Sequence, residues 1–67
     1  MFVDLDELQE EIKAVKGIAK DAGSAGKELL RNAKKAEELL KKAKESESKK
    51  DFAKTDTLVE QIKALLS

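Results

Sequence analysis

Apolar and small residues follow a helical spacing through the first third of the chain. From Leu5 onward they recur at alternating intervals of three and four, which places them on one face of an α-helix. Three acidic residues at positions 4–7, Asp4, Asp6 and Glu7, lie where carboxylates complement the positive end of a helix dipole. The pattern predicts a first helix over residues 4–22, with a stripe made of Leu5, Leu8, Ile12, Val15, Ala19 and Ala22.

Two later segments carry the same kind of pattern. A second helix is expected over residues 25–45 and a third over residues 49–66. Around the junction of these two helices, residues 41–50 hold one apolar residue, Ala43. We therefore expect the end of the second helix to fray and a loop to form near residues 46–48. Ser48 followed by Asp51 has the spacing of a helix start. The side chains expected to face the interior are Leu29, Leu30, Ala33, Ala36, Leu39, Leu40, Ala43, Phe52, Leu58, Val59, Ile62, Leu65 and Leu66.

Residues 22–26 decide how the first two helices are connected. Gly23 followed by Ser24 is typical of a helix-ending glycine and the N-cap of the next helix, which favours a tight turn. The stripe nevertheless continues past this point without a change of phase, through Gly26, Leu29, Ala33, Ala36, Leu40 and Ala43. A continuous helix would therefore also fit, at a cost of about 1 kcal/mol for each internal glycine.

The two connections predict different architectures. With the turn, the chain forms an all-α, small three-helix bundle in one domain, and this is our preferred prediction. With a continuous helix over residues 4–46, the third helix would fold back on its second half and leave residues 5–15 of the stripe bare. Such a helical hairpin would have to oligomerise through coiled-coil packing.

Composition limits the chemistry that the chain could perform. The 67 residues include no Cys and no His, which removes thiol nucleophiles, disulfides and the commonest transition-metal ligand. The serines and threonines have no histidine to activate them, and the many carboxylates fall on polar helix faces. Gly23–Lys27 lacks the glycine spacing and the preceding strand of a phosphate-binding loop. We expect neither an enzyme nor a cofactor, metal or small-molecule site.

A role in protein–protein interaction or assembly is the leading functional hypothesis. A chain this short forms a marginal core, so self-association or packing against a partner helix would add stability. Small residues permit close approach of two helices. The residues expected to make this contact, inside the bundle or with a partner, are Leu5, Leu8, Ile12 and Val15, with Ala19, Ala22 and Gly26 as points of close approach.

A row of lysines supports an alternative hypothesis. Lys13, Lys20, Lys27, Lys34 and Lys41 recur every seven residues, so on a continuous helix they would form one line. Adjacent lysines would then lie about 10 Å apart along the axis, a spacing suited to a nucleic acid or another polyanion. The simpler interpretation is a solvated helix face, because a heptad pattern confines lysine to outer positions.

The distribution of charged and apolar residues indicates where in the cell the chain could reside. The net charge is zero although 42% of residues are charged, and residues 1–11 carry a charge of −5 while residues 12–47 carry +4. No apolar run reaches the roughly 20 residues of a transmembrane helix, and the acidic N-terminus does not resemble a signal peptide. An intracellular location is the default expectation.

Overall fold

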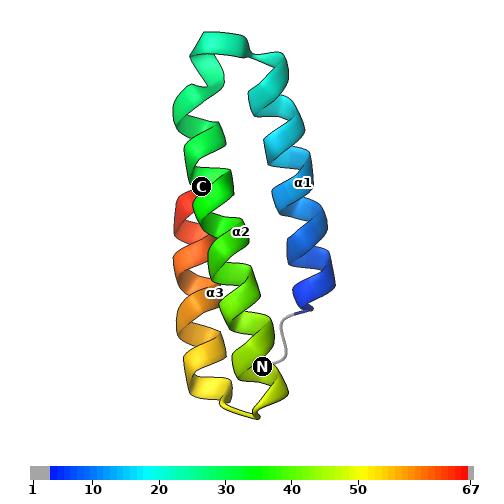
Figure 1. Cartoon of the computed structure of the whole chain (residues 1–67), viewed down its shortest axis with the longest axis vertical. Helices are drawn as coiled ribbons and strands as arrows, with labels where there is room; N and C mark the ends of the chain where they lie inside the picture. Colours follow the sequence, from blue (N-terminus) through cyan, green and yellow to red (C-terminus); the bar gives the residue numbers. More distant parts are fainter. Residues whose placement is uncertain (1–3, 67) are drawn as a thin grey trace.

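The chain folds into three helices that run up, down and up along one rod. The computed structural model describes residues 4–66, and its principal extents are 39 × 17 × 16 Å. Helix α1 (Leu5–Asp21) leads through a short 3-10 helix, η1 (Gly23–Gly26), into α2 (Lys27–Ser48), and α3 (Phe52–Leu66) returns alongside α2 (Figure 1). Helix α2 packs against both of the others. The three-helix bundle is therefore confirmed, and the long-helix hairpin is wrong.

An aspartate fixes the start of α1. Asp4 lies just outside the helix in extended conformation, and its Oδ1 accepts hydrogen bonds from the backbone N–H groups of Asp6, at 3.0 Å, and Glu7, at 3.4 Å. These N–H groups have no partner within the helix, so the carboxylate satisfies them while its charge complements the helix dipole. The acidic first turn expected from the sequence thus acts partly through a cap.

Two glycines make the turn between α1 and α2, each for its own reason. Gly23 has φ +62°, a left-handed conformation that side chains other than glycine rarely adopt. Gly26 has an ordinary φ, but a Cβ placed on it would collide with the carbonyl oxygen of Ala19. The predicted role of Ser24 as an N-cap is wrong, because η1 intervenes and α2 is preceded by Gly26 with no side-chain cap.

The loop expected near residues 46–48 is wrong, since α2 continues through Ser48. Ser46 is buried, and its hydroxyl lies 2.6 Å from the Thr55 hydroxyl of α3. Each hydroxyl also lies 3.0 Å from a carbonyl oxygen about one turn back in the chain, that of Ala43 for Ser46 and that of Asp51 for Thr55. Because each hydroxyl carries one proton, one hydroxyl donates to the other, and the accepting hydroxyl donates to its carbonyl. A buried hydroxyl is tolerated when it is hydrogen-bonded, and the partner here lies on another helix.

The connection from α2 to α3 is a Schellman motif with an unusual residue. The N–H of Asp51 donates to the carbonyl of Ser46 at 2.8 Å, and the N–H of Lys50 donates to that of Glu47 at 2.9 Å. Lys50 occupies the left-handed position, with φ +63°. Asp51 then caps α3 by accepting from the N–H of Lys54 at 3.3 Å. The predicted helix start at Ser48 is therefore wrong, and the cap lies three residues later.

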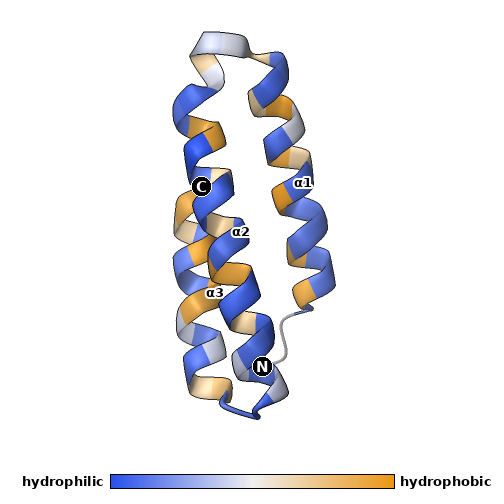
Figure 2. Cartoon of the chain, in the orientation of Figure 1, coloured by the Kyte–Doolittle hydropathy of each residue, from blue (hydrophilic) through white to orange (hydrophobic). Residues whose placement is uncertain are grey.

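One apolar cluster joins the three helices along the lower part of the rod. Alanines on α2 leave space for the larger side chains of α1 and α3, and Leu39, Leu65 and Leu66 cover the cluster as partly buried side chains. Figure 2 shows the hydrophobic positions on the facing sides of the helices. Phe52 was expected in the core but is 53% exposed. The cluster consists of Leu5, Leu8, Ile12, Ala36, Leu40, Ala43, Leu58, Val59 and Ile62.

The glycines offer a matched pair of tests of the turn. Gly26→Ala should lower the free energy of unfolding by about 2 kcal/mol, because the new methyl group has to displace backbone at Ala19. Gly17→Ala places a methyl group in open space inside α1 and should raise stability by about 0.5–1 kcal/mol. Urea denaturation followed by circular dichroism measures both, and equal effects of the two substitutions would contradict the close approach at Gly26.

Lys50→Gly tests the second connection. A left-handed residue with a side chain costs about 1–2 kcal/mol, and glycine removes this cost while losing more entropy on folding. The net gain should be about 0.5–1 kcal/mol, seen as a higher melting temperature. Lys49→Gly, at the helix cap with φ −87°, lacks this relief and should not stabilise the protein; a gain equal to that of Lys50→Gly would argue against the strain.

Candidate functional site

The stripe predicted for helix packing or partner contact lies mostly inside the bundle. Leu5, Leu8, Ile12 and Ala19 are buried, and Ile12 is 1% exposed. Gly26 is also buried, against the backbone of Ala19. These side chains are therefore occupied within the chain itself and have little surface left for a partner.

Two members of the predicted set differ from the rest. Val15 is only partly buried, and Ala22 is exposed at the C-cap of α1. Ala22 does not pack against α2 as the rest of the stripe does, because α1 ends at Asp21 and the chain turns away there. The close approach expected at Ala22 is thus made one turn earlier, between Ala19 and Gly26.

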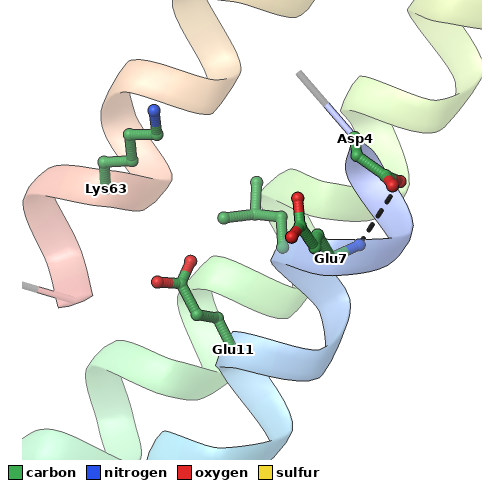
Figure 3. A pocket seen from close by; sticks show the side chains of 5 residues that line it. Asp4, Glu7, Glu11 and Lys63 are labelled. Carbon is green, nitrogen blue, oxygen red and sulfur yellow. Dashed lines mark hydrogen bonds between the residues drawn. The ribbon is translucent and has the colours of Figure 1, made fainter.

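An open groove of about 360 Å³ lies between α1 and α3. Asp4, Glu7, Leu8 and Glu11 form its α1 side, and Lys63 of α3 faces them (Figure 3). The Asp4 carboxylate is engaged in capping α1. The groove has the character of a charged surface, and no group of three or more metal-ligating side chains is arranged to hold an ion anywhere in residues 4–66.

Helix α3 does not cover the whole length of the α1–α2 pair. The Ser46–Thr55 contact places these two residues at the same height on α2 and α3. The helices are antiparallel, so the steps from Thr55 forward to Leu66 match equal steps from Ser46 back along α2, and Leu66 lies level with residue 35. In Figure 1 the C-terminal end of α3 accordingly lies about midway along α2, and the η1 end of the molecule consists of α1 and α2 alone. The first two turns of α2 therefore have no α3 beside them.

Partly exposed apolar side chains occur near the end of α3 and beyond it. Val15 and Ile18 lie one heptad beyond Leu8 and Glu11, and so continue the α1 face that borders the groove. Ile18 is 63% exposed, and Leu29 near the start of α2 is only partly buried. We call Val15, Ile18 and Leu29 the distal apolar surface. Sequence reasoning missed Ile18, because it lies outside the three-four stripe; its being large and apolar at an off-stripe position was the available signal.

The turn divides the predicted row of lysines between two helices. Lys13 and Lys20 lie on α1, whereas Lys27, Lys34 and Lys41 lie on α2, and all five are exposed. Two contacts on the side away from α3 join the helices: Lys16 Nζ lies 2.6 Å from Glu37 Oε1, and Lys44 Nζ donates to Gln9 Oε1 at 2.5 Å. The single line expected for a continuous helix is wrong, and the row is folded back on itself.

Comparisons with protein-family models, with curated proteins and with solved structures gave no match to this chain. Across the described residues, no helix combines the length and the apolar character needed to cross a membrane. The role of the chain must therefore be inferred from the surfaces described above.

Proposed function

We propose that this protein is a non-enzymatic helical interaction module that self-associates through its distal apolar surface. The observation that supports this role is the exposure of Ile18, one turn from partly buried Val15, at the level where α3 ends, together with the partial exposure of Leu29 in the part of α2 beyond α3. Single exposed apolar residues are common on proteins. Here, however, three of them border a stretch of the α1–α2 pair that lacks the third helix, and another helix would complete the packing.

Charge distribution supports a second copy of this chain as the partner. Residues 4–11 carry five acidic and no basic side chains, whereas residues 12–36 carry seven basic and two acidic side chains, a net charge of +5. The acidic segment lies near one end of the 39 Å rod, and the basic segment includes the η1 turn at the other end. Two copies lying antiparallel would bring opposite charges together at both ends, which favours encounter and orientation.

The same arrangement is compatible with two-fold symmetry. In a two-fold contact each copy uses the same surface, so a residue near the axis meets its own equivalent. The distal apolar surface and the acidic side of the groove belong to the same face of α1, because Val15 and Ile18 follow Leu8 and Glu11 by seven residues. A two-fold axis perpendicular to α1 at the level of Val15 and Ile18 would bring the two distal apolar surfaces together and leave the acidic sides of the grooves at the edges of the contact.

Ile18→Asp is the direct test of this role. The substitution puts a carboxylate into the proposed contact and should weaken association at least tenfold, equivalent to about 1.4 kcal/mol, while leaving the helical content unchanged because Ile18 is exposed. Sedimentation equilibrium over a wide concentration range measures the association. Ile12→Asp would not serve, since Ile12 is fully buried and its substitution should unfold the bundle.

Gln61→Glu provides a control with the same change of charge. Gln61 is exposed on α3, one heptad after Lys54, which lines the opposite groove between α2 and α3. This variant should associate like the parent protein. A parent that stays monomeric at millimolar concentration, or equal weakening by both substitutions, would overturn the proposal.

A further inference from the structure

The antiparallel pairing of α1 and α2 brings the lysines of the folded row side by side. Polar contacts between these helices pair Lys16 with Glu37, and Lys44 with both Gln9 and Asp6. The residue numbers of these pairs add up to 53, 53 and 50, so they set the level of one helix against the other to within about one turn. Residues whose numbers add up to 54 then lie within about one turn of each other in height, which holds for Lys13 with Lys41 and for Lys20 with Lys34.

These four lysines also lie on a common side of the molecule. Lys13 and Lys20 are each four residues beyond a contact residue of α1, Gln9 and Lys16 respectively, and so lie one turn along the same side. On α2, Lys34 and Lys41 are each three residues before a contact residue, Glu37 and Lys44 respectively. All four therefore border the α1–α2 contact on the side away from α3. We call these four residues, with Lys27 beside the turn, the lysine face.

The lysine face forms no ion pairs within residues 4–66, although the exposed Glu38 lies within one turn of both Lys34 and Lys41. Its five lysines are exposed and take part in no ion pair with any described residue, in contrast to Lys16 and Lys44, whose ammonium groups are held by acidic or amide side chains. Within each helix the lysines are spaced by one heptad, about 10 Å, and packed helices are about 8–10 Å apart. The fold thus converts a row about 40 Å long into a compact array of ammonium groups.

We propose that the lysine face binds the phosphate backbone of double-stranded nucleic acid without sequence preference. Lysine acts as a flexible point charge towards phosphate and reads no base by itself. Aromatic side chains, on which single-stranded bases stack, are absent from this face, and the chain has no Trp or Tyr. The exposed Ile18 belongs to the groove side, so the lysine face presents no apolar anchor of the kind that inserts into a lipid surface.

Salt dependence gives the first measurement. A labelled duplex of about 20 base pairs of DNA should bind the full chain at low ionic strength in fluorescence anisotropy titrations. With four to five phosphate contacts, the logarithm of the association constant should fall against the logarithm of salt concentration with a slope of about −4. Absence of binding at about 20 mM salt would overturn the proposal.

Two triple variants with the same change of net charge locate the binding. Lys13→Gln, Lys20→Gln and Lys34→Gln combined should weaken binding more than about tenfold and reduce the salt slope by about 3. Lys42→Gln, Lys54→Gln and Lys63→Gln combined remove the same charge from the two grooves that border α3 and should change affinity less than about threefold. Equal losses in both variants would show that net charge alone determines binding and would overturn the assignment.

Two further measurements separate the lysine face from a lipid-binding surface and from the surface of self-association. Anionic phospholipid vesicles in a flotation assay should retain less protein than the duplex does, and retention by vesicles without duplex binding would overturn the proposal in favour of a lipid surface. Ile18→Asp should leave duplex affinity per chain within about threefold, because Ile18 lies on the groove side. Failure of self-association and failure of duplex binding are therefore distinguishable.

Discussion

The closeness of Gly26 to the backbone of Ala19 is the constraint on which the rest of the structure depends. The small-residue stripe is in register for one continuous helix, and only the reversal at Gly23–Gly26 folds its second half onto its first. Gly23 supplies the left-handed backbone, and Gly26 supplies space that a methyl group would fill. Because both requirements are met within four residues, the stripe becomes the interior of the bundle, and the surfaces available to partners lie elsewhere.

Periodicity was sufficient for much of the fold. The stripe from Leu5 to Ala19 located α1 to within a residue at each end, because a large amphipathic helix repeats its signal over several turns. The features that were missed depend on single contacts between distant residues. Ser46 in a polar segment predicts a loop, but its hydrogen bond with Thr55 of α3 places it inside the bundle. Lys50 adopts a left-handed conformation that usually belongs to glycine. Phe52 is exposed although its residue type favours burial.

The candidate surfaces were predictable to a different extent. The heptad spacing of Lys13 and its successors was visible in the sequence, but their pairing across two helices required the level set by Lys16 with Glu37. Ile18 carried a weak signal, since one off-stripe apolar residue is common on helices, and its importance depends on where α3 ends. The net charge of zero did not predict a charged surface, because an acidic and a basic segment cancel in the sum. The fold places these segments towards opposite ends of the rod.

The buried hydroxyl pair of Ser46 and Thr55 has a consequence for the outline of the molecule. Apolar side chains pack almost as well after a helix slides by one turn, but such a slip would break the hydrogen bond between the two hydroxyls. Each hydroxyl would keep its local carbonyl acceptor, so the slip would cost the net value of one hydrogen bond, about 0.5–1.5 kcal/mol. The pair therefore favours one register of α3 against α2. It sets the height at which that helix stops, and with it how much of the α1–α2 pair stays open to a second molecule.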